Sequence, residues 1–349
     1  MKAQNFNDNW RVKHLEDEAG WREVTLPDDA MLREPRTADA LGGLNVCWFE
    51  GHDYLYSKTF SLSAEELEKH YVLEFEGVYR KAEVIINNKA AGFRPYGYTN
   101  FYVDCDEFLK EGSNTVQVIA RNADQPNSRW YSGAGIYRPV KMWVSGKKHI
   151  ELNGIKIRTL SINPAKIEVT VKTNEEGPVC VEISGGETVL ASAEGAERRF
   201  EMELPEAKLW SPDAPCLYTC KVKFADDEAE ESFGIRTLTW GNDGMKINGE
   251  RVILRGACVH HDNGLLGAVC DPDALERRIR ILKENGYNAL RSAHNPCSKT
   301  ALQICDRLGM LVMDEYIDHW YIHKTLHDYV EHFDEWWKQD MKDMVEKDY

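Results

Sequence analysis

The strongest constraint in this sequence is a change of pattern near Trp240. Up to that residue, short runs such as 82–86 and 167–171 alternate β-branched or aromatic residues with polar ones. A period of two is typical of half-buried antiparallel strands. After Trp240, short apolar runs alternate with amphipathic stretches of helical length, which predicts parallel βα units. With 349 residues, the chain exceeds what one hydrophobic core usually supports, so we expect several domains.

The strand-rich part divides into two expected domains. Residues 1–146 hold many short strands and few helices, which predicts a β-sandwich of the jelly-roll type. Residues 147–238 continue in the same manner but more compactly. Roughly 90 residues of this kind suit a small immunoglobulin-like β-sandwich. The likeness to immunoglobulins is architectural only, since no cysteines stand at antibody-like spacing.

Residues 239–349 form the third expected domain. Short strands are predicted at 252–254, 288–291 and 311–314. Helices are predicted from Pro272 to about 285, at 299–308 and from about 327 to 347. This order predicts the first part of a (β/α)8 barrel. About three βα units are too few to close such a barrel, which needs about 250 residues.

The composition excludes some classes of partner. The formal net charge is −15 and the pI about 5.3, which disfavours nucleic acid and anionic membranes and suits neutral ligands. No apolar run approaches the roughly 20 residues that span a bilayer. The first ten residues lack the apolar run of a signal peptide, and the nine cysteines include no C-x-x-C pair. We therefore expect a cytoplasmic protein with reduced thiols.

Three groups of motifs resemble glycoside hydrolase family 2 of the β-galactosidase and β-glucuronidase type. The first is RWYSGAGIYR at 129–138, near the end of the jelly roll. The second is FGIR at 233–236, followed by ING and LRG at 247–249 and 254–256. The third is NALRSAHNP at 288–296 with CDRLGMLVMDE at 305–315. The resemblance covers the chain nearly end to end and implies a galactose-binding-like jelly roll, an immunoglobulin-like sandwich and a TIM barrel.

Polar residues at the carboxyl ends of barrel strands face the pocket of such a fold. His260 follows the first predicted strand, Arg291 and His294 end the second, and Asp318 and Trp320 follow the third. The resemblance implies that His260 and His294 contact sugar hydroxyls. It also implies that Arg291 orients the carboxylate of the nucleophile, a task that suits the planar guanidinium fork. Trp320 is a candidate aromatic platform for a sugar ring.

Several of these assignments leave two interpretations open. Trp130 and Tyr131 either border the pocket or pack in the seam between domains. Asp318 with Glu315 either binds a Mg²⁺ or Na⁺ ion of the whole enzyme or hydrogen-bonds the strand end. Adjacent histidines rarely bind one ion, so His260 is expected to be a pocket residue rather than a metal ligand. No other cofactor is expected, and no metal ligand is assigned.

The resemblance implies a retaining mechanism with two carboxylic acids about 5 Å apart. Family members carry these glutamates after the fourth strand and near the seventh, so we expect both beyond Tyr349 and expect this segment alone to be inactive. The parent protein is then an exo-acting β-galactosidase, with β-glucuronidase as the alternative. A non-catalytic carbohydrate-binding protein is the rival from another class. The expected partner is a carbohydrate substrate, and a homo-oligomer is allowed.

Overall fold

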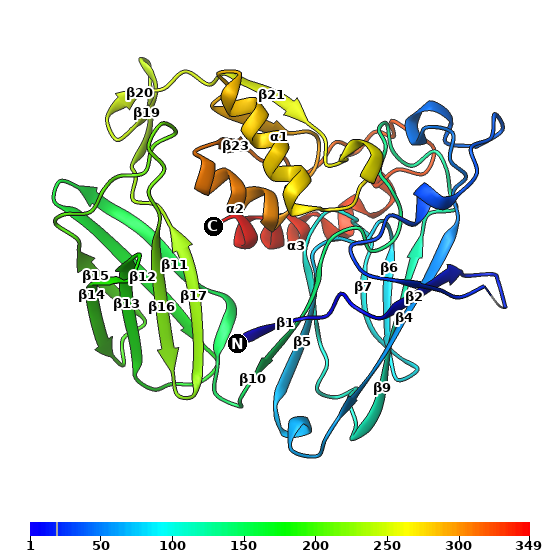
Figure 1. Ribbon diagram of the computed structural model, residues 1–349, viewed down its shortest axis with the longest axis horizontal. Helices are drawn as coiled ribbons and strands as arrows, with labels where there is room; N and C mark the ends of the chain where they lie inside the picture. The colour runs from blue at the N-terminus through cyan, green and yellow to red at the C-terminus, as the bar shows by residue number, and fades with distance from the viewer. Residues whose placement is uncertain (19) are drawn as a thin grey trace.

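The computed structural model describes residues 1–18 and 20–349. Two β-sandwiches stand side by side, and a smaller helix-containing unit lies above and between them (Figure 1). The jelly roll is drawn in blue, cyan and green, the immunoglobulin-like sandwich in green to yellow-green, and the partial barrel in yellow to red. The predicted fold class is therefore confirmed.

The jelly roll is built from two antiparallel sheets. One sheet has the order β1 (Lys2–Asn5), β10 (Val140–Ser145), β5 (His70–Phe75) and β8 (Phe101–Asp104). The other has the order β3 (Arg22–Val24), β2 (Trp10–His14), β4 (Asp53–Leu62), β9 (Gly112–Arg121), β6 (Ala82–Ile86) and β7 (Lys89–Arg94). Alternate residues of β9 are buried, as the period of two predicts. Short 3-10 helices lie in its loops: η1 (Ala30–Arg33), η2 (Gly43–Val46) and η3 (Glu66–Glu68).

The immunoglobulin-like sandwich also has two antiparallel sheets. The first has the order β11 (Ile150–Ile162), β12 (Ala165–Thr173) and β15 (Arg199–Glu203). The second has the order β14 (Thr188–Gly195), β13 (Val179–Gly185), β16 (Tyr218–Phe224) and β17 (Asp227–Phe233). A small sheet that the sequence pattern did not reveal then leads to the barrel: β18 (Leu238–Gly241), β19 (Gly244–Ile247) and β20 (Glu250–Arg251).

The partial barrel has three parallel strands, β21 (Gly256–Val259), β22 (Ala289–Ser292) and β23 (Leu311–Met313). Its helices are α1 (Pro272–Glu284), α2 (Lys299–Leu308) and α3 (Val330–Asp348), and the 3-10 helix η4 (Gly264–Leu266) follows β21. The Asp271 carboxylate caps α1 by accepting a hydrogen bond of 2.8 Å from the Ala274 amide, and Ser298 caps α2 in the same way. Gly309 ends α2 with a φ of 73°, which glycine adopts without steric cost.

The prediction of a strand at 252–254 was wrong. The Val252 amide bonds to the Met245 carbonyl and so continues the preceding hairpin. The Asn288 side chain then donates to the Ile253 carbonyl at 3.0 Å and accepts from the Arg255 amide at 2.7 Å. Because these backbone groups are already paired, the parallel ladder starts at Gly256 instead.

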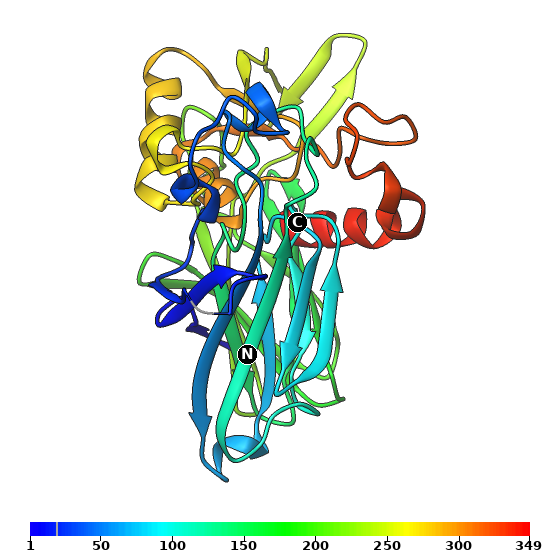
Figure 2. The ribbon, with the colours of Figure 1, turned by 90° about the vertical axis from the view of Figure 1, so that its right-hand side faces the viewer.

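Figure 2 shows α3 lying across the upper end of the jelly-roll strands. A buried ion group joins the two elements. Arg94 on β7 bonds Asp340 and Asp343 of α3, at 2.7 Å in each case. Asp340 has no exposed surface, and it also accepts hydrogen bonds from the hydroxyls of Tyr316 and Tyr329. Buried carboxylates are stable only when they are paired in this way.

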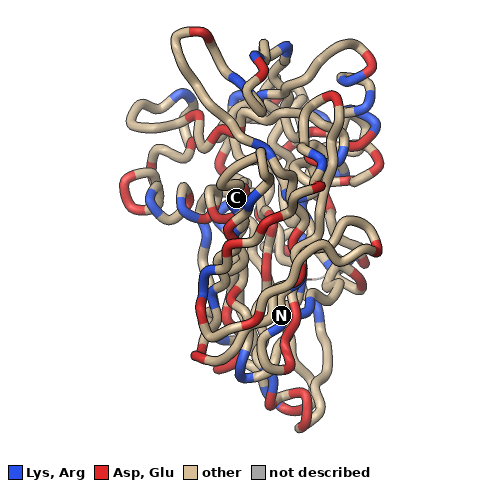
Figure 3. The backbone as a smooth tube through the Cα atoms, turned by 90° about the vertical axis from the view of Figure 1, so that its left-hand side faces the viewer, with Lys and Arg blue, Asp and Glu red and all other residues tan. Residues whose placement is uncertain are grey.

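The surface charge is mixed rather than gathered by sign. On the side that Figure 3 presents, acidic and basic residues are interspersed over all parts of the chain. Among the described residues, no helix combines the length and the apolar character needed to cross a membrane. All nine cysteines lie in the described part and are free thiols.

We predict that Arg94→Met weakens the attachment of α3. The substitution keeps an aliphatic side chain but leaves two buried carboxylates without a cation, so the free energy of unfolding should fall by about 3–5 kcal/mol. Urea unfolding followed by tryptophan fluorescence measures the change. Lys89→Met, at the exposed start of the same strand, is the matched control and should have little effect. Equal unfolding midpoints for both variants would contradict the importance of this ion group.

Candidate functional site

The site lies at the carboxyl ends of the three barrel strands, where Arg291 occupies the central strand, β22. The Arg291 guanidinium forms a fork with the Glu315 carboxylate. Its Nη2 lies 3.0 Å from Oε2, and its Nε donates to Oε1. Its Nη1 lies 3.1 Å from the Cys258 Sγ on the neighbouring strand β21. A bidentate pair of this kind fixes the plane of the guanidinium.

His294 joins this pair two residues after β22 ends. Its Nδ1 lies 3.3 Å from both Arg291 Nη2 and Glu315 Oε2. The arginine nitrogen can only donate, whereas the carboxylate oxygen can only accept. Proton placement on His294 therefore decides which of the two contacts is a hydrogen bond. Either arrangement holds the imidazole beside the guanidinium.

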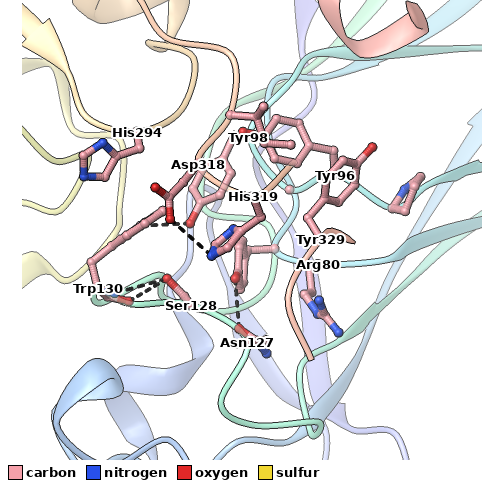
Figure 4. A pocket seen from close by; sticks show the side chains of 14 residues that line it. Arg80, Tyr96, Tyr98, Asn127, Ser128, Trp130, His294, Asp318, His319 and Tyr329 are labelled. Carbon is pink, nitrogen blue, oxygen red and sulfur yellow. Dashed lines mark hydrogen bonds and ion pairs between the residues drawn. The ribbon is translucent and has the colours of Figure 1, made fainter. Parts of the chain in front are cut away.

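Trp130 brings the jelly roll into the site. Its ring centroid lies 5.4 Å from those of His260 and His294, and it stacks on His319 at 6.0 Å with an interplanar angle of 17°. Its indole Nε1 donates to the Tyr98 hydroxyl at 3.1 Å. Figure 4 shows Trp130, His294, Asp318 and His319 on one side of a small pocket, with Tyr96 and Tyr329 on the other. An aromatic surface edged by imidazoles is a suitable contact for a sugar ring.

Asp318 is held by basic residues. Arg129 donates to both of its oxygens, at 2.9 and 2.6 Å, and Lys324 Nζ lies 2.7 Å from Oδ1. Burial acts to raise the pKa of Asp318, but the hydrogen bonds from Arg129 and Lys324 outweigh it and lower the pKa. The Asp318 carboxylate thus joins the loop after β23 to the loop that carries Trp130.

Glu315 and Asp318, the two carboxylates considered for a cation, are each paired with an arginine. Mg²⁺ and Na⁺ are hard ions that prefer oxygen ligands such as carboxylates. Binding of a Mg²⁺ or Na⁺ ion by these two carboxylates in the whole enzyme stays a prediction.

The other sequence-predicted residues lie in different surroundings. Trp320 is 60% exposed and borders an open groove together with Arg291, His294 and Glu315. The Tyr131 hydroxyl instead donates to Asp29 Oδ2 at 2.7 Å. The structure thus brings His260, Arg291, His294 and Trp130 together and leaves Trp320 at the edge. The roles of all these side chains stay predictions.

Asp29 is a carboxylate to which the sequence pattern gave no role. Besides Tyr131, it accepts hydrogen bonds from the amides of Ala134, at 3.0 Å, and Ala268, at 2.8 Å. Burial is the largest influence on the pKa of Asp29 and raises it, although these hydrogen bonds act in the opposite direction. Because Ala268 belongs to the barrel, Asp29 links the two domains beneath the site.

Sequence reasoning also missed Arg129, His319 and the pairing of Glu315 with Arg291. Arg129 directly precedes Trp130, and His319 directly follows Asp318, so their positions beside candidate residues were the available signal. The contacts themselves join residues far apart in the chain. Arg129 and Asp318, for example, are separated by 189 positions.

Burial shifts three histidines around the pocket toward the neutral form. Burial lowers the pKa of His260, with a smaller contribution from the neighbouring His294, and burial likewise lowers the pKa of His319. Burial lowers the pKa of His261 to about 4. The Nε2 of His261 lies 3.0 Å from the Ser132 carbonyl, which can only accept, so this nitrogen carries the proton. Neutral imidazoles can both donate to and accept from sugar hydroxyls.

Three family models match this chain in consecutive order. A "Glycosyl hydrolase 2 galactose-binding domain-like" model matches residues 10–160, and "Glycosyl hydrolases family 2" matches 149–236. The "Glycosyl hydrolases family 2, TIM barrel domain" model matches 240–344. Two sandwiches followed by barrel strands with polar side chains at their carboxyl ends thus define the class of glycoside hydrolases. Within that class, the chain belongs to glycoside hydrolase family 2.

Similar proteins are longer than this chain. A β-galactosidase from Bacteroides ovatus is 35% identical over 99% of the chain and 45% of its own length. A Formosa agariphila protein provisionally named a β-glucuronidase is 34% identical over 99% of the chain and 36% of its own length. The solved structure of a family 2 member from Bacteroides cellulosilyticus has a TM-score of 0.92 and 32% identity, covering 100% of this chain and 50% of its own. The chain therefore spans about half the length of these relatives or less.

The neutral His261 generates a prediction about pH. The ordinary pKa of histidine is about 6.5, so the unfolded chain takes up this proton before the folded protein does. Stability from His261 is present above pH 6.5 and is lost as the pH falls toward about 4. His261→Gln should therefore flatten the fall of unfolding free energy in this range, by up to about 1.4 kcal/mol per pH unit.

Denaturant unfolding at several pH values between 7 and 4 measures this slope. Gln4→Asn, on the exposed strand β1, changes no titratable group and is the control that should keep the slope of the unsubstituted protein. An unchanged slope in His261→Gln would show that the pKa of this imidazole is the same in the folded and the unfolded chain.

Proposed function

We propose that the whole protein to which this chain belongs is a retaining exo-glycosidase that releases terminal β-galactose. The observation that carries this proposal is the convergence of His260, His294 and the Arg291–Glu315 fork around the Trp130 ring. Sugars are bound by hydrogen bonds to their hydroxyls and by contact with an aromatic face. The described residues supply both kinds of contact at the carboxyl ends of barrel strands.

The choice of galactose rests on similarity. The B. ovatus relative named as a β-galactosidase matches almost the whole chain at 35% identity. A β-glucuronidase activity is the second candidate, because the F. agariphila relative matches equally far at 34%. We propose a cytoplasmic location as well, which the nine free thiols support. A neutral glycan as substrate agrees with the acidic composition.

The chain's own residues would bind and orient the substrate. In this proposal His260 and His294 contact sugar hydroxyls, while Glu315 holds the guanidinium plane of Arg291. The remaining Nη1 edge of Arg291, beside the Cys258 thiol, is available to orient the nucleophile's carboxylate. Asp318 acts as a positioning residue, because it anchors Arg129 next to Trp130.

A retaining enzyme needs two carboxylic acids about 5 Å apart, one to protonate the leaving oxygen and one to form the glycosyl-enzyme. Glu315 and Asp318 are paired with arginines and are poorly suited to either task. We propose that later strands of the complete barrel supply both acids. Residues 1–349 alone would then bind sugar without hydrolysing it.

Hydrolysis of nitrophenyl β-galactoside, β-glucuronide and β-mannoside by the full-length protein tests the proposal. We expect the highest kcat/KM on the galactoside. A higher value on the glucuronide would favour the second candidate. Binding of galactosides without hydrolysis would indicate a carbohydrate-binding protein instead.

We predict that Arg291→Lys lowers kcat/KM on the preferred substrate by about 10²-fold, a loss typical of removing one oriented donor from an active site. An ammonium group cannot form the two-pronged contact with Glu315 while facing the nucleophile. Arg280→Lys, on the exposed face of α1, is the matched control and should retain activity. Full activity of Arg291→Lys would exclude the orienting role.

A further inference from the structure

A second cluster of polar side chains lies in the jelly roll. His14 ends β2, and His52 directly precedes β4. Since His14 pairs with Tyr54 across these antiparallel strands, His52 lies two residues away on the same face of the sheet. The imidazole rings stack with centroids 4.3 Å apart and an interplanar angle of 11°. Because an imidazole lone pair lies in the ring plane, one ring has to turn about its Cβ–Cγ bond for both nitrogens to reach one ion. Glu34, just after η1, approaches both rings.

The atoms of this cluster are spaced like the ligands of one ion. Glu34 Oε1 lies 2.9 Å from His14 Nε2, and Glu34 Oε2 lies 3.6 Å from His52 Nε2. All three side chains have ligand atoms within 4.8 Å of one another. Zinc bonds to nitrogen and oxygen are about 2.0–2.2 Å long, which puts neighbouring ligands of a tetrahedral ion about 3.3 Å apart. The observed separations lie on either side of that value.

The surroundings also suit a cation. The Tyr54 hydroxyl donates to Glu34 Oε1 at 3.0 Å and so orients the carboxylate, as partners of metal ligands commonly do. Glu50 Oε2 lies 3.7 Å from His52 Nε2, and Asp17 Oδ2 lies 3.7 Å from His14 Nδ1. Glu34 is nearly buried, at 9% exposure, whereas each histidine is 35% exposed. The cluster is thus negatively charged and open on its histidine side.

We propose that His14, His52 and Glu34 form a binding site for a divalent transition metal, with Zn²⁺ as the ion that suits the donors. Two imidazoles and one carboxylate are a recurring three-ligand set for zinc. Imidazole ligands favour zinc, copper and nickel over the oxygen-loving Mg²⁺ and Ca²⁺. Water or the nearby Glu50 would occupy the fourth coordination position of the ion. The metal would tie together the two ends of the 35–51 loop, which carries η2.

A second histidine cluster in the same domain provides a comparison. His70 lies 2.6 Å from Asp106, with Asp104 close by. However, Asp106 also accepts from the Tyr71 amide at 2.8 Å, and Asp104 accepts from the Asp106 amide at 3.1 Å. Both carboxylates already accept hydrogen bonds from backbone amides. This cluster therefore serves as a matched control.

Metal titration of the full-length protein after chelator treatment tests the site. Calorimetry with Zn²⁺ measures stoichiometry and affinity, and the visible absorption of Co²⁺ reports nitrogen and oxygen ligands directly. We expect His52→Gln and His14→Gln to weaken one equivalent of binding by more than about tenfold. The same substitutions should remove the rise in melting temperature that saturating Zn²⁺ produces. His70→Gln should preserve both effects.

Two results would overturn the proposal. One is the absence of saturable Zn²⁺ binding in the micromolar range. The other is equal stoichiometry and affinity in the unsubstituted protein and in His52→Gln. Circular dichroism checks that each variant is folded. His52 lies outside the strands, just before β4, so its substitution disturbs no strand pairing. Glycosidase activity is not a readout, so this test is independent of the proposed function.

Discussion

The buried ion group between Arg94 and the two aspartates of α3 sets the position of much that surrounds the pocket. Asp340 accepts hydrogen bonds from the hydroxyls of Tyr316 and Tyr329. These two tyrosines flank the loop that carries Asp318 and His319. Both ends of that loop are therefore anchored to one carboxylate, and that carboxylate is anchored to the jelly roll through Arg94. Because the interior is closely packed, a shift of α3 would move the loop with it.

The pocket is consequently a property of two domains together. The barrel contributes Arg291 and His294 from the end of one strand, whereas the jelly roll contributes Arg129 and Trp130 from a loop. The barrel strand positions Arg291 and His294, and the Arg129–Asp318 ion pair positions Trp130. Lys299 of α2 reaches the buried Glu74 of the jelly roll at 2.6 Å, so the same interface is fixed on its other side. A site built this way gains orientation from contacts that touch no substrate.

The sequence predicted the features that depend on local pattern. Alternation at 82–86 placed a strand, and Asp271-Pro272 together with Gly309 marked helix ends, because caps and periods act over a few residues. The start of the first barrel strand was missed, because the side chain of the distant Asn288 decides it. The pairing of Arg129 with Asp318 was also missed. Such contacts arise from packing between domains, and the local hydrophobic pattern of a sequence does not predict them.

The hydrogen bonds of Asp29 have a consequence for how this protein could be recombined. The linker between the jelly roll and the next sandwich looks like a natural point of exchange. Yet Asp29 binds the Ala268 amide of the barrel while it holds Tyr131, the neighbour of Trp130. In a chimaera that joined this barrel to a foreign first domain, the Ala268 amide would lack its carboxylate partner. The pocket would also lose the Trp130 ring. The jelly roll and the barrel would therefore have to be exchanged together, because their contacts cross the domain boundary.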